Sequence, residues 1–292
     1  MLELPLTYLL TDRLRSATHR YIRECLSLNL KEECAETFGP EELAKRYGEE
    51  LKLLPNLTPN GLVMCKEEVV DSYNSILVAA ANIIKYLGLN NTCDSIHCPV
   101  NIRLRWGIPD QYILERPRAS TKWHSDLWAG ESSDNVTIHI PIFGNFVDNG
   151  MSLMKTADEF FPNYIRPLPS FDEAAELVNN PQEYDIDMQI GNAYLVDSFL
   201  LHRTRYGHPS FRAILSFHLR PYIELESSLY KGEEAREENY MSSDQWVQLG
   251  QEYFVFTDKK FEAYTEEDVT QNRYADTYEV ISKAKYENIR KA

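Results

Sequence analysis

The chemically reactive residues with the tightest spacing are an imidazole and a carboxylate two positions apart, in Trp123-His124-Ser125-Asp126. In extended chain, side chains at positions i and i+2 point the same way, so both groups could meet at one metal ion. Two histidines and one carboxylate on one side of iron(II) leave positions open for a co-substrate and oxygen. Seven histidines and 45 acidic residues predict about one such pair by chance, so the pair needs further support.

A third ligand and an anion-binding cation follow later in the chain. His202 ends an apolar segment, with Thr204 two positions on, and Arg212 opens another apolar segment ten residues after His202. A guanidinium group binds a carboxylate through two charge-assisted hydrogen bonds. Taken singly, His202 could be a hydrogen-bonded core histidine and Arg212 a surface cation. Their order after the first pair favours a metal site next to an anion site.

The elements that must position these residues are predicted to be strands. Between residues 98 and 222, short segments rich in β-branched and aromatic residues alternate with Gly, Pro, Asn and Asp. A helical insertion capped by Ser170 is expected over Ser170–Asn179. The predicted strands are Pro99–Trp106, Tyr112–Arg116, Asn135–Phe143, Met151–Lys155, Tyr184–Ile190, Asn192–Asp197 and Phe211–Tyr222.

Three of these strands alternate apolar and polar residues along Asn101–Trp106, Asn135–Ile142 and Phe211–Arg220. One interpretation is a half-exposed sheet with its polar side in water. The other is a small barrel or sandwich whose polar face lines a ligand cavity while helices cover the apolar face. Helix-rich flanks on both sides favour the second interpretation.

Those flanks are residues 1–97 and 223–292. Leu14–Leu30 and Glu67–Leu87 carry apolar residues at three- and four-residue spacing, and helix starts are expected near Thr11, Pro40 and Pro59. Residues 223–292 are charge-rich and predicted to be helical. The sequence has no internal repeat or low-complexity linker, so we expect one α+β domain over residues 1–292.

The composition of the chain limits which partners it can bind and where it is expected to function. The net charge of −15 argues against nucleic acid and anionic membranes, which need cationic surface. The sequence shows no apolar run of the roughly 18–20 residues needed to cross a bilayer and no signal peptide. Five cysteines without a C-x-x-C pair indicate a reducing cytoplasm. Arginines and lysines gather in Asn101–Lys122 and Phe199–Tyr222, which indicates an anion site unless the clustering is chance on solvated loops.

The combined pattern resembles the iron(II)- and 2-oxoglutarate-dependent oxygenases, and among them the phytanoyl-CoA dioxygenase group. The likeness covers about Asn101–Tyr222 and includes Trp123, the turn Asp148-Asn149-Gly150, and Gly191–Asp197 leading to His202. In place of the family's Pro-Gly-Ser-His, the chain has Met154–Asp158, and Asn192 replaces its aspartate. Both differences lie outside the ligand set.

The resemblance implies a double-stranded β-helix (jelly-roll, cupin-like) core flanked by N- and C-terminal helices. It also implies iron(II) at His124, Asp126 and His202, with O2 and 2-oxoglutarate as co-substrates. The distal carboxylate of 2-oxoglutarate would bind Arg212, helped by Thr204. Halogenating relatives have a small residue in place of Asp126, so the carboxylate favours hydroxylation or another C–H oxidation.

The remaining contacts are expected from nearby polar and aromatic residues. Arg105 and His139 are candidates for the co-substrate, and Arg103, Lys122 and Trp128 for the substrate. The cations favour a small anionic metabolite, such as a nucleotide-linked sugar, an amino acid or a natural-product intermediate. Two alternatives stay open: a cupin-like metal enzyme that does not use 2-oxoglutarate, and a non-catalytic anion-binding barrel. The helical parts are candidates for a lid or a homodimer contact.

Overall fold

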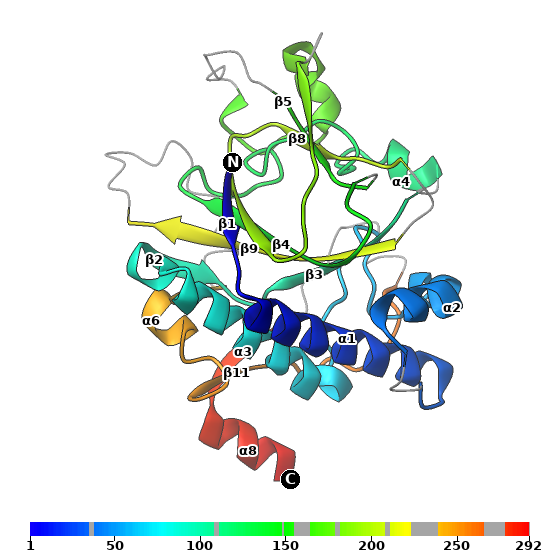
Figure 1. The fold of residues 1–292 in the computed structure, drawn as a ribbon, viewed down its shortest axis with the longest axis vertical. Coiled ribbons are helices and arrows are strands. Elements are labelled where there is room, and N and C mark those ends of the chain that lie inside the picture. The colour runs from blue at the N-terminus through cyan, green and yellow to red at the C-terminus, as the bar shows by residue number, and fades with distance from the viewer. Residues whose placement is uncertain are drawn as a thin grey trace.

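The computed structural model describes residues 1–34, 38–107, 111–147, 149–154, 164–178, 182–207, 211–222, 239–265 and 278–291. These residues form a mixed helix and antiparallel-sheet structure (Figure 1). The larger sheet has the strand order β1-β7-β4-β9-β2-β10, and β3 also pairs with β9. Its strands are β1 (Leu2–Pro5), β2 (Cys93–His97), β3 (Asn101–Trp106), β4 (Val136–Gly144), β7 (Asn192–Asp197), β9 (Phe211–Pro221) and β10 (Tyr240–Ser242).

A smaller antiparallel sheet, of order β6-β5-β8, faces the larger one. Met151 and Leu153 of β5 pack in one hydrophobic cluster with Tyr194 of β7 and Ile214 of β9. Ile214 lies on the same face of β9 as Arg212 and Ser216, so the polar face of the larger sheet is turned toward the smaller sheet. We call the layer of side chains between the two sheets the lumen. The smaller sheet consists of β5 (Met151–Met154), β6 (Glu183–Ile186) and β8 (His202–Thr204).

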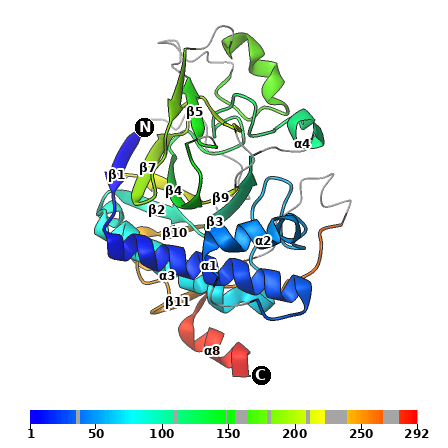
Figure 2. The same ribbon diagram turned by 45° about the vertical axis from the view of Figure 1, so that its right-hand side comes forward.

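The other face of the larger sheet is apolar and is covered by helices. α1 (Tyr8–Leu30) and α3 (Val70–Tyr86) cross beneath it, and α2 (Pro40–Lys52) lies at the end of β3 (Figures 1 and 2). Ile138 and Ile140 of β4 and Leu215 of β9 belong to the same buried cluster as the inner faces of α1 and α3. Each such side chain contributes roughly 1.5–3 kcal/mol on burial, which explains why the helices cover this face. The structure thus favours the cavity-lining interpretation of the alternating strands.

The helices begin where capping chemistry allows. Thr7 caps α1 and its hydroxyl accepts the Leu10 N–H, so α1 begins at Tyr8 and not near Thr11. α2 begins at Pro40, as predicted. No helix begins at Pro59 within the described segment around it, because residues 57–63 form a turn closed by a bridge between Leu57 and Val63.

Most predicted strands are present, but one is wrong. Tyr112–Arg116 forms the short helix α4 (Gln111–Glu115), supported by a 2.8 Å hydrogen bond from the Gln111 amide to the Glu115 carboxylate. A short apolar run does not distinguish helix from strand by itself. The expected insertion after Ser170 is the 3₁₀ helix η4 (Phe171–Val178), and the Ser170 hydroxyl accepts the Asp172 N–H at 3.2 Å.

The flanks contain strands as well as helices, which corrects the prediction that both are helical. β1 and β2 come from the N-terminal part and β10 from the C-terminal part, and all three join the larger sheet. The C-terminal part further contributes α6 (Ser243–Trp246), β11 (Tyr253–Phe256), β12 (Glu279–Ser282) and α8 (Lys283–Lys291). Some residues of the predicted segments lie outside the described residues: Asp148, Lys155–Asp158 and Asn179.

Two facing antiparallel sheets agree with the α+β class. The closed double-stranded β-helix and the single domain over residues 1–292 stay predictions. Among the helices that the structure describes, none has the length and apolar character required to cross a membrane.

Candidate metal centre

His124, Asp126 and His202 meet in the lumen. The backbones of His124 and His202 pair in an isolated antiparallel bridge, which links the loop before β4 to the start of β8. The ligating atoms of the three side chains all lie within 4.8 Å of one another. The Nε2 atom of His202 is 3.8 Å from Oδ1 of Asp126. The fold therefore brings the pair at positions 124 and 126 to a histidine about 80 positions later.

Both imidazoles are held in the form that binds a metal through Nε2. Nδ1 of His124 lies 2.8 Å from the Lys122 carbonyl, and Nδ1 of His202 lies 2.9 Å from the Leu200 carbonyl. Each Nδ1–H therefore donates to a carbonyl two residues back, which leaves the Nε2 lone pair free to coordinate. Burial and neighbouring His202 lower the pKa of His124 to about 3, so this imidazole is neutral at pH 7.

The carboxylate is ionised and held on one side. Burial would raise the pKa of Asp126, but His202, His218, His139 and the hydrogen bond from Thr137 together bring this pKa below its ordinary value. The Thr137 hydroxyl donates to Oδ2 of Asp126 at 2.5 Å. With Oδ2 engaged, Oδ1 is the oxygen available to a metal.

This donor set fits iron(II). Two neutral imidazole nitrogens and one carboxylate oxygen, converging from one wall of a polar space, form the ligand set of non-haem iron(II) sites with open positions. Within the described part of the chain, no other group of three or more His, Cys, Asp or Glu side chains comes close enough to hold a metal ion.

Behind Asp126 the hydrogen bonds continue through residues that the sequence analysis missed. Nδ1 of His218 lies 3.1 Å from the Thr137 hydroxyl, and its Nε2 lies 3.4 Å from Oε1 of Glu131. Thr137 and His218 are register partners on β4 and β9. The apolar–polar alternation of β4 and β9 predicts that Thr137 and His218 lie on the polar face. That they lie opposite each other depends on the register between the two strands.

The cationic residues of the lumen come from two adjacent strands. Arg105 of β3 is the direct register partner of Arg212 of β9, and Arg103 lies two positions along β3 on the same face. Arg105 and Arg212 are 6% and 5% exposed. Burial and nearby arginines lower the pKa of Arg212 to about 9 and that of Arg103 to about 10, so both stay charged at pH 7.

Buried polar atoms without a hydrogen-bond partner gather around these arginines. They are Nε of Arg103, Arg105 and Arg212, Nε2 of His139 and the hydroxyl of Tyr206. Such atoms are costly when unsatisfied. The set therefore indicates a lumen built to receive a polar ligand, and Tyr206 is a further residue that the sequence analysis missed.

Thr204 and His139 lie at different places along this lumen. The Thr204 N–H donates to the Ser120 carbonyl at 2.7 Å, and the Ser120 hydroxyl accepts from Arg105 at 2.9 Å, so Thr204 lies at the Arg105 end. His139 lies nearer the metal cluster, as its electrostatic interactions with Asp126, His202 and Arg103 indicate. Burial lowers the pKa of His139 to about 3.

Two predicted substrate contacts have other roles. Trp128 is fully buried in a cluster with Leu168 and Phe171, and its indole N–H donates to the Tyr164 carbonyl at 3.0 Å. Trp128 therefore packs inside the protein, and its contact with a substrate stays a prediction. The Lys122 ammonium forms an ion pair with Asp172 at 2.5 Å, while its carbonyl orients His124.

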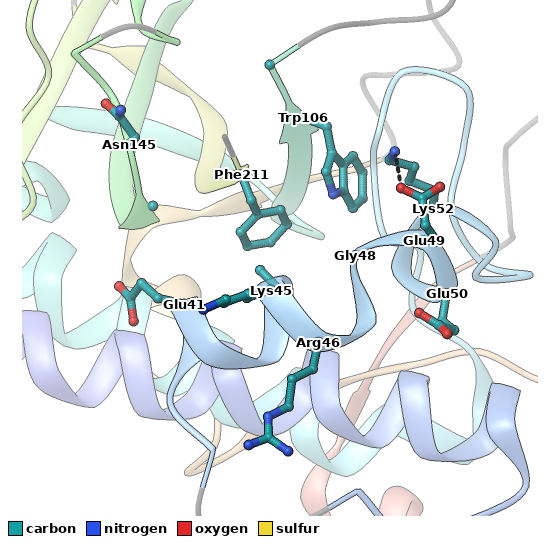
Figure 3. Close-up of a pocket in the computed structure, with 13 residues that line it drawn as sticks. Glu41, Lys45, Arg46, Gly48, Glu49, Glu50, Lys52, Trp106, Asn145 and Phe211 are labelled. Atoms are coloured by element: carbon teal, nitrogen blue, oxygen red, sulfur yellow. Dashed lines mark hydrogen bonds and ion pairs between the residues drawn. The ribbon is translucent and has the colours of Figure 1, made fainter. Parts of the chain in front are cut away.

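A separate groove of about 830 Å³ lies between α2 and the ends of β3, β4 and β9. Figure 3 shows Trp106 and Phe211 above α2, close to Lys45 and Gly48. Strand alternation turns Trp106 and Phe211 away from the lumen face that carries Arg105 and Arg212. The groove is therefore distinct from the metal cluster.

Comparisons with known proteins give no close relative: no family model and no curated protein matches the sequence. Among solved structures, the α-ketoglutarate-dependent epimerase SnoN from nogalamycin biosynthesis is 13% identical, with a TM-score of 0.38 over 75% of this chain and 76% of its own. EctD from S. alaskensis, solved with 2-oxoglutarate and 5-hydroxyectoine, is 15% identical, with a TM-score of 0.38 over 80% and 81%. AviO1 from Streptomyces viridochromogenes Tue57 is 12% identical, with a TM-score of 0.37 over 75% and 87%. All three TM-scores are below 0.5, so the case for a function rests on the site's own residues.

Proposed function

We propose that this chain is an iron(II)- and 2-oxoglutarate-dependent oxygenase that oxidises a C–H bond of a small polar metabolite. The observation that carries the proposal is the convergence of two Nε2 lone pairs and one carboxylate oxygen within 4.8 Å, in a lumen lined by arginines whose Nε atoms have no hydrogen-bond partner. His124, Asp126 and His202 would hold the iron. Bound iron(II) would supply oxygen activation, coupled to the conversion of 2-oxoglutarate to succinate and CO2.

The protein's own contribution begins with holding the co-substrate. Arg105 and Arg212 lie side by side across two strands, which suits a carboxylate that accepts hydrogen bonds from both. Ser216, the register partner of His139, lies four residues from Arg212, or about 13 Å along an extended strand. That length accommodates a five-carbon dicarboxylate together with the arginine side chain that reaches it.

Other residues would position the reacting groups and exclude water. Thr204 and Ser120 border the Arg105 end, and His139 lies near the position expected for the 2-oxo acid end. Phe171 stacks on the His124 ring with centroids 4.7 Å apart and shields this ligand. Assignment to the phytanoyl-CoA dioxygenase group is part of the same proposal and is supported by the motifs around these residues.

The experiment measures 2-oxoglutarate binding and turnover. Calorimetry on Mn(II)-loaded protein should show one 2-oxoglutarate site, and Arg212→Gln should weaken it by about 10- to 100-fold, because a hydrogen bond to a charged group contributes about 1.5–3 kcal/mol. Arg20→Gln, which removes a solvent-exposed arginine of α1, serves as the control. Succinate should form with Fe(II), ascorbate and 2-oxoglutarate. Absence of 2-oxoglutarate binding, or binding that Arg212→Gln leaves unchanged, would point to a metal enzyme that does not use this co-substrate.

A further inference from the structure

We infer that the lumen binds a second anion beside 2-oxoglutarate and that Arg103 holds it, so the primary substrate carries a phosphate or carboxylate close to the carbon that is oxidised. This inference rests on the proposed function and adds to it a substrate class and a specificity-determining residue.

The first argument is the charge of the lumen. Among the main electrostatic interactions of Arg103, Arg105 and Arg212, one is with a carboxylate, that of Asp126 on Arg103. A divalent metal and three guanidinium groups against one carboxylate leave four positive charges in excess, and 2-oxoglutarate offsets two of them. Buried charges are costly unless they are paired. A substrate that brings one or two negative charges would complete the balance.

The second argument is the position of Arg103. Arg105 and Arg212 are register partners, and Arg105 is tied to the Ser120 hydroxyl, so these two form one carboxylate site. Arg103 lies two residues along β3, about 7 Å nearer the metal end of the lumen. Arg103 interacts electrostatically with Asp126 and with His124. Arg103 therefore serves a different part of the lumen.

The third argument is an unpaired group on this part of β3. Nε of Arg103 is buried without a hydrogen-bond partner, on the sheet face that His139 shares from the other side of β9. The Glu131 carboxylate lies 3.4 Å from Nε2 of His218. The guanidinium of Arg103 suits a phosphate or carboxylate oxygen.

The test uses the full chain loaded with Mn(II) and saturated with 2-oxoglutarate, and inorganic phosphate and acetate as probes. We expect at least one probe to bind without displacing 2-oxoglutarate, and the bound paramagnetic Mn(II) should broaden its ³¹P or methyl ¹H resonance. Arg103→Gln should weaken the probe at least about tenfold and leave 2-oxoglutarate affinity within a few-fold, since one hydrogen bond to a charged group contributes about 1.5–3 kcal/mol. Arg103→Lys, which keeps the charge, should retain part of the affinity, and Arg20→Gln should behave as wild type.

The outcomes are separable. Preference for phosphate identifies a phosphorylated substrate, and preference for acetate identifies a carboxylic acid. If both probes compete with 2-oxoglutarate, if neither binds, or if Arg103→Gln weakens 2-oxoglutarate instead of the probe, the second site is refuted while the oxygenase proposal stands. If 2-oxoglutarate itself does not bind, the proposed function fails first.

Discussion

Replacing Thr137 with valine tests how the protein holds its metal-binding carboxylate. Valine keeps the β-branched shape that suits β4 but removes the hydroxyl that donates to Oδ2 of Asp126 at 2.5 Å. A hydrogen bond to a charged group contributes about 1.5–3 kcal/mol, and each 1.4 kcal/mol changes an equilibrium tenfold. We therefore expect metal affinity to fall by about 10- to 100-fold, the range known for groups that orient metal ligands.

The assay is competition for Co(II) against a coloured chelator, with the visible spectrum of the Co(II) protein as a second readout. Freed from Thr137, Oδ2 of Asp126 could also approach the metal, so the d–d bands should change along with the affinity. Thr137→Ser should restore both. Thr92→Val, which removes a hydroxyl that donates to the Leu89 carbonyl, should change neither. Wild-type affinity and spectrum in Thr137→Val would refute the idea that this hydroxyl positions the carboxylate.

Three further predictions concern stability. Because His124 and His139 have folded-state pKa values near 3, against about 6.5 when unfolded, the unfolded chain binds protons first on acidification. Stability of the metal-free protein should fall from pH 7 to 5 by roughly 2 kcal/mol per histidine, measured by urea unfolding, and His139→Gln should remove part of that slope. Gly144→Ala should destabilise the protein more than Gly191→Ala. Both residues have φ near +100°, but only at Gly144 would a Cβ collide with the β9 backbone. Equal losses in the free energy of unfolding would contradict this reasoning. Trp128→Ala should cost about 3–5 kcal/mol, and a loss below 1 kcal/mol would show that it is not a core residue.

Local sequence signals predicted the parts of the site that depend on short spacing. The His124 and Asp126 pair, the strand β7 and the strand that carries Arg212 follow from alternation and from turn residues next to them. The support for Asp126 could not be predicted, because Thr137 and His218 become neighbours only through the β4–β9 register. Strand alternation says which face a residue occupies and not which residue lies opposite.

The strands in the flanks were not predicted because they pair over long distances in the sequence. β1 pairs with β7, some 190 residues later, and β10 pairs with β2, so neither edge strand has a partner that local sequence reveals. Tyr112–Arg116 is too short for its composition to distinguish a helix from a strand. The burial of Trp128 under η4 and the segment before it also depends on contacts that local sequence does not reveal, and its contact with a substrate stays a prediction.

The continuous strand β9 would determine the length of the co-substrate that fits in the lumen. The rise per residue of an extended strand varies little, so the four residues from Arg212 to Ser216 would set the separation between the proposed carboxylate anchor and the proposed metal. If 2-oxoglutarate binds as proposed, a 2-oxo diacid one methylene shorter or longer should bind more weakly, because β9 is paired on each side and the arginine side chain would have to take up the difference. The hydrogen-bonded sheet, more than the contacts of any single side chain, would thus select the co-substrate by its length.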